Sequence, residues 1–243
     1  MSILEHPKIQ ELRKHVSDQE ILEKQGLLNL YLRDPDNYQV ILEPELNVVN
    51  SIKLVNPGVY YLEDSYFDLP LELNQFEINE DASGDCRSVV LARFANLDSA
   101  IIYGGNGIGK TSYCIACANK AYEKYNVKFL YVSWPDVING CLNFGDKNTY
   151  IDQLKRAPYL IIDDLGFENI THFSRDNILL PIINHRLEKS LMTIVITNFS
   201  AKELIPRYMV DKHDDKICKT LESKLYALGP EIKCVGRNWR NGG

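Results

Sequence analysis

The sequence predicts an α/β domain with a central parallel sheet of five strands, preceded by a small helical and irregular N-terminal region. Three observations carry this prediction. From about residue 87 onward, short apolar runs alternate with longer segments of helical periodicity. A glycine-rich loop joins one apolar run to the next helix, and two further runs end abruptly in polar residues. We therefore expect an N-terminal region and linker at residues 1–84 and the α/β domain at residues 85–243.

The composition is typical of a soluble globular protein. The chain has 243 residues, of which 45% are hydrophobic and 25% charged. No run approaches the roughly 18 apolar residues of a membrane helix, and the start, "MSILEHPKIQ", shows no signal core, so a cytoplasmic location is expected. Six cysteines do not make a disulfide framework in a chain this long. Cys114 and Cys117 fall inside a predicted helix and are expected to be buried core residues rather than zinc ligands.

The net charge of −6 is unevenly distributed along the chain. Residues 1–100 carry 8 Lys and Arg against 18 Asp and Glu, whereas residues 201–243 carry 9 against 6. An acidic front and a mildly basic rear suggest different partners for the two ends, although solvated surface charge explains much of the same pattern. The overall acidity argues against a constitutive high-affinity nucleic-acid binder but permits a local basic patch.

The N-terminal region is expected to begin with two helices. Ile9, Leu12 and Val16 recur at helical spacing, and Asp18 is a candidate cap for the second helix. Residues 38–84 mix apolar and aromatic residues with prolines and acids, which predicts short strands, turns and extended chain. The stretch "NEDASGD" at residues 79–85 is typical of a surface turn and marks the expected boundary.

The elements of the α/β domain follow from the alternation of apolar runs and helical periodicity. The expected strands are residues 100–103, 128–134, 159–163, 192–197 and 232–235. The expected helices are residues 87–94, 111–125, 136–142, 150–155, 173–189, 201–205 and 217–228.

The stretch "IIYGGNGIGKTSY" places the spacing Gly-x-x-x-x-Gly-Lys-Thr between a strand and a helix, which predicts a phosphate-binding loop. Glycines let backbone N–H groups approach phosphate oxygens, and the helix N-terminus adds free donors. Lys110 is expected to reach the β and γ phosphates, and the Thr111 hydroxyl to bind Mg²⁺. A glycine-rich turn without function is the alternative, which the flanking strand and helix disfavour. The expected nucleotide-binding residues are Gly104, Gly105, Asn106, Gly107, Ile108, Gly109, Lys110, Thr111 and Ser112.

Two adjacent acids, Asp163 and Asp164, end the apolar strand of residues 159–163, and burying two carboxylates is costly. An ATPase with a phosphate loop needs an acid at the end of a second strand to hold Mg²⁺. We expect Asp163 to hold the ion through water and Asp164 to polarise the attacking water. The alternative for Asp164 is a strand-end acid that caps the next turn. Many such ATPases have the longer Glu at the second position, so slow turnover is expected here. Asn198 ends a third strand, where it would orient the water.

These three motifs together resemble those of the AAA+ ATPases. The stretches "YGGNGIGKT", "YLIIDDLGFE", "INHRLEKSLMTIVITNFS" and "LESKLYALGPEIKCVGRNWR" are similar to the DnaC/DnaI-type replicative helicase loaders and to their relative IstB, a transposition ATPase. The resemblance covers about residues 87–240. It implies a P-loop AAA+ (ASCE) domain without a helical lid, since only 45 residues remain after Asn198.

The resemblance also implies that a cation from a neighbouring subunit completes each active site. Lys224 stands where the loaders have this arginine, and Thr220 stands where they have its partner. Lysine carries the charge but cannot make the planar bidentate contact. Other candidates for this role are Arg186, Arg207, Arg237 and Arg240.

In the loaders, a helical insertion before the paired acids touches single-stranded DNA, and the matching stretch here is residues 134–156. The resemblance implies phosphate contacts by Lys147, Lys155 and Arg156 and base stacking by Phe144 or Tyr150, unless these aromatics are core residues. It also implies a helicase-docking element at about residues 5–33. This element contains no cysteine and is therefore expected to bind no zinc.

The motifs thus predict ATP and Mg²⁺ binding, and the resemblance implies a replicative helicase loader. It would bind a hexameric DnaB-type helicase through its N-terminal region, assemble with itself on that helicase, and assist loading onto single-stranded DNA. A bacterial chromosome, a phage or a mobile element could encode it. Two alternatives stay open: an IstB-like transposition ATPase that binds duplex DNA and a transposase, and an adaptor that uses nucleotide only structurally.

Overall fold

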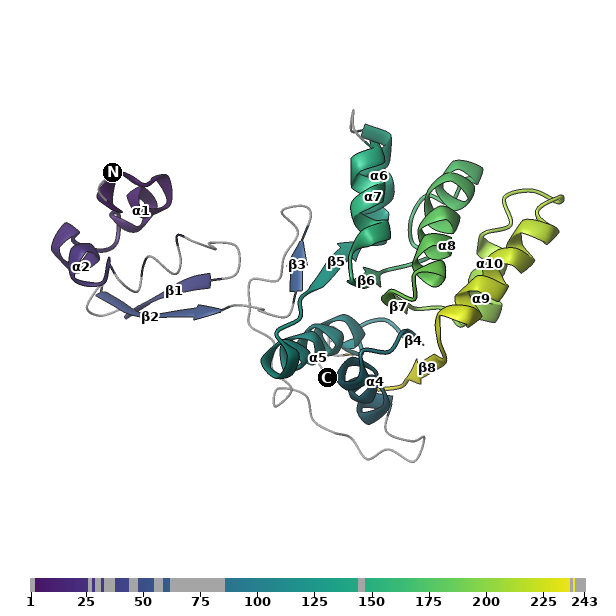
Figure 1. Ribbon diagram of the computed structural model, residues 1–243, viewed down its shortest axis with the longest axis horizontal. Helices are drawn as coiled ribbons and strands as arrows, with labels where there is room; N and C mark the ends of the chain where they lie inside the picture. Colours follow the sequence, from purple (N-terminus) through teal and green to yellow (C-terminus); the bar gives the residue numbers. More distant parts are fainter. Residues whose placement is uncertain are drawn as a thin grey trace. The chain divides into compact units, whose positions relative to one another are not determined.

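The computed structural model describes residues 3–25, 28, 32, 38–43, 48–54, 59–61, 86–143, 147–236 and 238 (Figure 1). The chain divides into two compact units. The first comprises Met1–Pro57 and Phe67–Pro70, and the second comprises Gly58–Tyr66 and Leu71–Gly243. The second unit thus includes a segment that precedes the boundary expected after residue 84.

The first unit contains two short helices and a strand pair. After a 3-10 turn at Ile3–Glu5 come α1 (Pro7–Leu12) and α2 (Asp18–Glu23), and β1 (Tyr38–Glu43) pairs antiparallel with β2 (Val48–Leu54). The two predicted helices are confirmed, but the cap of the second is Ser17, whose hydroxyl accepts a hydrogen bond from the Glu20 N–H at 3.2 Å. Asp18 is the first residue of that helix, because serine fits the cap position equally well. The core of this unit consists of Ile3, Ile9, Val16, Ile21 and Leu28.

The second unit is built on a parallel sheet of six strands rather than the predicted five, in the order β3-β5-β6-β7-β4-β8. The additional strand, β3, pairs with β5 at one edge of the sheet. It has only three residues, which is too short for an alternating pattern to be recognised in the sequence. The strands are β3 (Val59–Tyr61), β4 (Ala100–Gly104), β5 (Phe129–Ser133), β6 (Tyr159–Asp163), β7 (Met192–Thr197) and β8 (Glu231–Cys234).

Helices cover both faces of this sheet, with α4 and α5 on one side and α6 to α10 on the other (Figure 1). Within the described residues no helix follows β8, and none is both long and apolar enough to cross a membrane. The helices are α4 (Cys86–Asn96), α5 (Lys110–Tyr125), α6 (Trp134–Asn143), α7 (Lys147–Arg156), α8 (Leu180–Glu188), α9 (Ala201–Arg207) and α10 (Asp215–Leu228).

One predicted helix differs in form from the expectation. The segment Phe173–Leu179 is a π-helix that leads directly into α8, where the sequence predicts a continuous α-helix over residues 173–189. Pro181 stands in the first turn of α8. Because proline has no N–H and crowds the carbonyl four residues earlier, an α-helical hydrogen bond cannot form there, and a wider turn precedes it.

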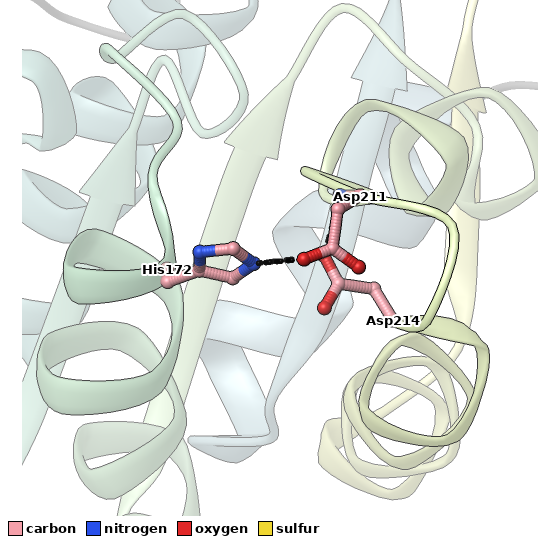
Figure 2. Close-up of side chains that lie close together, drawn as sticks. All are labelled: His172, Asp211 and Asp214. Atoms are coloured by element: carbon pink, nitrogen blue, oxygen red, sulfur yellow. Dashed lines mark hydrogen bonds and ion pairs between the residues drawn. The ribbon is translucent and has the colours of Figure 1, made fainter.

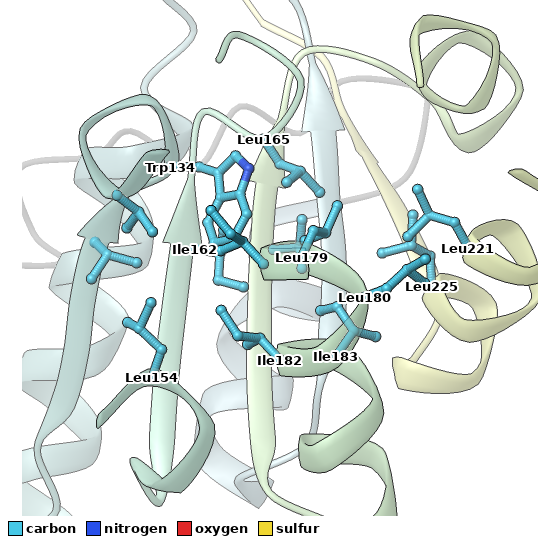
Figure 3. Packing of buried hydrophobic residues seen from close by; sticks show 14 of the residues in the cluster. Trp134, Leu154, Ile162, Leu165, Leu179, Leu180, Ile182, Ile183, Leu221 and Leu225 are labelled. Atoms are coloured by element: carbon cyan, nitrogen blue, oxygen red, sulfur yellow. The ribbon is translucent and has the colours of Figure 1, made fainter. Parts of the chain in front are cut away.

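The core explains why the strands are apolar almost throughout, since both faces of a parallel sheet are covered. Ile162 of β6 faces the side on which Leu179, Ile182 and Leu225 pack (Figure 3), and Leu160 belongs to the same hydrophobic cluster. Asp163 then falls on the opposite face, towards α5, because side chains alternate along a strand. The register of the core thus directs the last acid of β6 to the helix that follows the phosphate loop.

Candidate nucleotide-binding site

The predicted phosphate loop lies between β4 and α5, as expected from the sequence. Gly104 has φ +150°, and a Cβ there would overlap the carbonyl oxygen of Cys234 in the neighbouring strand β8. Gly109, immediately before α5, has φ +87°, a left-handed conformation that only glycine adopts without strain. The glycines therefore leave the loop backbone without side chains where α5 begins. This arrangement lets backbone N–H groups surround a phosphate.

Lys110 bends back over this loop. Its ammonium Nζ donates hydrogen bonds to the carbonyl oxygens of Gly104 and Gly105, both at 2.9 Å, and to Asn198 Oδ1 at 2.6 Å. Burial lowers the pKa of Lys110, because the charged form loses hydration there. All three acceptors are neutral, so a phosphate would compete well for this cation.

Thr111 and Asp163 meet next to the loop. The Thr111 hydroxyl donates to Asp163 Oδ2 at 2.8 Å, and the Tyr131 hydroxyl donates to the same oxygen at 2.7 Å. Asp163 is 2% exposed, and burial raises its pKa although these two hydrogen bonds oppose the rise. Hydroxyl and carboxylate oxygens are the ligands that Mg²⁺ prefers, and the two are already adjacent. These residues therefore fit a Mg²⁺ ion beside a bound phosphate.

Asp164 differs from its neighbour in exposure and backbone. It is exposed, its N–H donates to Asp163 Oδ1 at 2.8 Å, and its φ is +56°. Aspartate is several-fold enriched in this left-handed region among non-glycine residues. The backbone at this position thus gives a physical reason for aspartate where glutamate is common in related sites. The Asp164 charge is close enough to Lys110 to raise that lysine's pKa against the effect of burial.

Asn198 follows β7, which lies between β6 and β4 in the sheet. Its side-chain amide accepts the hydrogen bond from Lys110 and donates to the Asn106 side chain in the loop. The carboxyl ends of three strands therefore converge on one loop. The structure brings together the predicted Lys110, Thr111, Asp163 and Asn198, with Asp164 adjacent.

Arg186, a candidate cation for a neighbouring active site, has a position that contradicts this role. The side chain is 0% exposed and donates to the carbonyl oxygens of Ala157 at 2.7 Å and Met192 at 2.6 Å. It also donates to Leu154 O at 2.8 Å and Thr193 Oγ1 at 2.8 Å. Burial lowers its pKa to about 10. A guanidinium with this many internal acceptors serves the fold and does not reach a second subunit.

The other candidate cations have different surroundings. Lys224 is half-buried on α10. Arg207 is exposed, with its guanidinium carbon 4.2 Å from the centre of the Phe199 ring and Nε donating to Gly166 O at 3.2 Å. Arg237 and Arg240 lie outside the described residues.

The candidate DNA contacts are partly accessible. Arg156 is exposed at the end of α7 and pairs with Asp152 at 3.4 Å, and Lys155 lies 4.0 Å from the same carboxylate. Tyr150 is partly buried and packs against the main core, so the core alternative holds for this residue. The side chains of Phe144 and Lys147 lie outside the described part of the structure.

A cluster that sequence reasoning missed holds the segment after α9. Arg175 is 1% exposed, and its Nη1 donates to Asp214 Oδ2 at 2.7 Å and to Tyr208 O at 2.6 Å. His172 Nε2 lies 3.2 Å from Asp211 Oδ2 and 3.3 Å from Asp214 Oδ2 (Figure 2). Arg175 and Asp214 are 39 residues apart, so no local pattern announces the pair.

This cluster is an ion-pair network rather than a metal centre. Ligand atoms of His172, Asp211 and Asp214 do lie within 4.8 Å of one another. However, Asp214 Oδ2 already accepts hydrogen bonds from Arg175 and from the backbone N–H groups of Val210 and Asp211. The Arg175 guanidinium holds the pKa of Asp214 well below its usual range. The network therefore anchors the start of α10 to the π-helical segment.

The chain is similar to several known proteins. The replicative helicase loader DnaI of Bacillus subtilis (strain 168) is 32% identical over 148 residues, which are 58% of this chain and 47% of that protein. The chain thus spans less than half of the length of this relative. A crystal structure of DnaI superposes with a TM-score of 0.60 at 24% identity, over 69% of this chain and 89% of that one.

A crystal structure of the DnaC helicase loader gives a TM-score of 0.56 at 20% identity, over 68% of this chain and 96% of that one. These likenesses show the P-loop AAA+ fold. The sequence profile of the IstB-like ATP binding proteins matches residues 60–213, which is more than half of the chain and includes the loop, both aspartates and Asn198. The chain therefore belongs to the family of IstB-like ATP-binding proteins.

Proposed function

We propose that this protein is an ATP-dependent loader of a replicative helicase, which binds a hexameric DnaB-type helicase and assists its loading onto single-stranded DNA. One observation carries the proposal. The ends of β4, β6 and β7 converge on a phosphate loop through the Lys110–Asn198 and Thr111–Asp163 contacts, in a chain 32% identical to a replicative helicase loader over 148 residues.

The contacts of the site suggest how nucleotide would act as a switch. Lys110 and the loop N–H groups would take the phosphates, so that Lys110 exchanges its bond to Asn198 for a phosphate oxygen. Thr111 and Asp163 would hold Mg²⁺, which neutralises the developing charge on the phosphates during hydrolysis. Asn198 would then be free to orient the water that Asp164 polarises. The same exchange would report nucleotide occupancy from the loop to β7.

The partners follow from the same proposal. The helical N-terminal region would dock on the helicase, and neighbouring copies of the chain would assemble on it. Lys224 would approach the nucleotide of the adjacent copy, with exposed Arg207 as the alternative. Lys155 and Arg156, together with Lys147 and Phe144, would contact single-stranded DNA near α7.

The direct test measures ATP binding, helicase capture and helicase-dependent strand unwinding for the wild type, Lys110→Ala and Lys120→Ala. Lys120 is an exposed lysine on the same helix α5, paired with Glu123 at 2.7 Å, and serves as the matched control. The proposal expects Lys110→Ala alone to lose ATP binding and helicase loading. Unchanged helicase capture and unwinding by Lys110→Ala would contradict an ATP switch.

A second candidate function is favoured by the family match itself. The chain matches the IstB-like ATP binding proteins over residues 60–213, and we propose as the alternative a transposition ATPase that binds duplex DNA and a transposase. Equilibrium binding to matched single-stranded and duplex oligonucleotides separates the two, because the loader should prefer the single strand. A third possibility, an adaptor that binds nucleotide without significant hydrolysis, is tested by phosphate release in the presence of helicase and DNA.

A further inference from the structure

Arg87 lies beside the phosphate loop, in the first turn of α4. It lines a small hollow between the start of α4, the loop and the end of β8, together with Ile108, Lys110, Tyr113 and Val235. Because Gly109 and Lys110 also line this hollow, it flanks the place where the phosphates of a nucleotide would sit. The rest of a nucleotide bound there must leave the loop along one of its flanks.

Two contacts tie Arg87 to the helix that begins at the loop. The Tyr113 hydroxyl donates to the Arg87 carbonyl oxygen at 2.9 Å. The guanidinium carbon of Arg87 lies 5.9 Å from the centre of the Tyr113 ring, within reach of a cation–π interaction. Tyr113 stands only two residues after Thr111, so Arg87 is held in a defined position relative to the phosphate-binding residues.

One guanidinium nitrogen of Arg87 has no hydrogen-bond partner within the described part of the chain. Its Nη1 is buried and makes no hydrogen bond with the described residues. The contrast is with Arg186, whose Nη1 meets the carbonyl oxygens of Leu154 and Ala157. Since nearly all buried donors in folded proteins are paired, a donor left alone next to a phosphate loop indicates an acceptor on a ligand.

We propose that Arg87 reads the purine base of the bound nucleotide by donating a hydrogen bond from Nη1 to the ring nitrogen N7. This inference rests on the proposed nucleotide binding. A guanidinium has donors only, and N7 is an acceptor in both adenine and guanine. Pyrimidines have no N7. Arg87 therefore selects purine over pyrimidine nucleotides and does not by itself separate ATP from GTP.

The hollow must open for this contact to form. Its volume of about 20 Å³ suits a single water rather than a base. Val235 is 41% exposed just past the end of β8 and forms part of the lining. A base would enter by moving this side chain and sliding along the Arg87 guanidinium, while the Tyr113–Arg87 backbone contact keeps the start of α4 in place.

The experiment measures dissociation constants of ATP, 7-deaza-ATP and CTP by titration calorimetry, for the wild type, Arg87→Met and Arg93→Met. Arg93 is the matched control, since it is a partly exposed arginine on the same helix and pairs with Asp98 at 3.5 Å. The wild type should bind 7-deaza-ATP at least about tenfold more weakly than ATP, the value of one charged hydrogen bond. Arg87→Met should weaken ATP binding to the same extent and leave the affinities for 7-deaza-ATP and CTP as in the wild type.

Each other outcome overturns the inference in a recognisable way. If Arg87→Met loses affinity for ATP and 7-deaza-ATP equally, Arg87 acts on the fold or on the phosphates. If its affinity for ATP is unchanged, Arg87 makes no contact with the base. Failure of the wild type to bind ATP, or binding that survives Lys110→Ala, would overturn the proposed nucleotide site and the inference with it. If thermal unfolding shows that Arg87→Met does not fold, the same titrations are made with Arg87→Lys. This variant keeps the charge and the aliphatic stem but lacks the forked donors.

Discussion

The two ends of the parallel strands hold charges in opposite ways. We call them the carboxyl edge and the amino edge of the sheet. At the carboxyl edge, Lys110 rests on two loop carbonyls and an asparagine, and Asp163 on two hydroxyls and one N–H, all of which can be exchanged for ligand atoms. At the amino edge, Arg186 donates to backbone carbonyls before β6 and at the start of β7. Burial of a charge therefore does not identify a functional residue. The kind of partner does.

The largest effect that this comparison predicts is on stability at the amino edge. Arg186→Met should lower the free energy of unfolding by about 3–5 kcal/mol, because several buried carbonyl oxygens each lose a charged donor. Lys110→Met, at the carboxyl edge, should cost less, since its hydrogen bond to the Gly105 carbonyl is exposed and Lys110 itself is only half-buried. Urea denaturation of both variants measures the difference. A mild effect of Arg186→Met combined with a loss of ATPase only in the assembled state would restore Arg186 as a catalytic candidate.

The next effect concerns turnover. Asp164→Asn should reduce the helicase-stimulated ATPase rate by about a hundredfold, the usual value of a positioned acid or base, and leave ATP affinity unchanged. Asparagine tolerates the left-handed backbone of this position as well as aspartate does, so the fold should be preserved. Single-turnover kinetics and nucleotide titration separate the two quantities. A weakened ATP affinity at an unchanged rate would assign Asp164 to binding rather than to chemistry.

The two edges also show how far the sequence alone reaches. The phosphate loop, Asp163 and Asn198 were predictable because glycine spacing and strand ends are local patterns, and parallel strands end at one edge. β3 was not, because three residues carry no period. Nor were the roles of Arg186 and Arg175, whose partners come from distant segments of the chain. The sequence shows which residues are charged but not which distant segments pack against them.

A smaller effect is expected for the cation that we propose comes from a neighbouring copy. Lys224→Ala should lower the ATPase rate of the assembled protein by about tenfold, less than the loss of an arginine finger, since lysine makes no bidentate contact. ATP binding by the isolated chain should not change. Lys219→Ala, an exposed lysine on the same helix α10, is the control. Unchanged turnover in Lys224→Ala with a defect in Arg207→Ala would move the role to Arg207.

The smallest effect tests whether the Asp163 carboxylate costs stability. Its folded-state pKa is raised by burial, above the unfolded value near 3.9. Between these two values the folded protein binds more protons than the unfolded one, so the wild type loses stability relative to Asp163→Asn as the pH rises, and the difference is constant above both. The Thr111 and Tyr131 hydroxyls can turn to accept from the new amide.

Asp163→Asn should therefore match the wild type in stability at pH 4 and exceed it at pH 7 by about 0.5–1 kcal/mol, the lower part of the range for a single stabilising substitution. Urea denaturation at the two pH values measures both differences, and Mg²⁺-dependent ATPase should be lost throughout. If the variant is less stable than the wild type by the same amount at both pH values, Asp163 stabilises the fold, as Arg186 does. A gain confined to the higher pH would separate Asp163 from Arg186, as a charge held at the expense of the fold for a ligand.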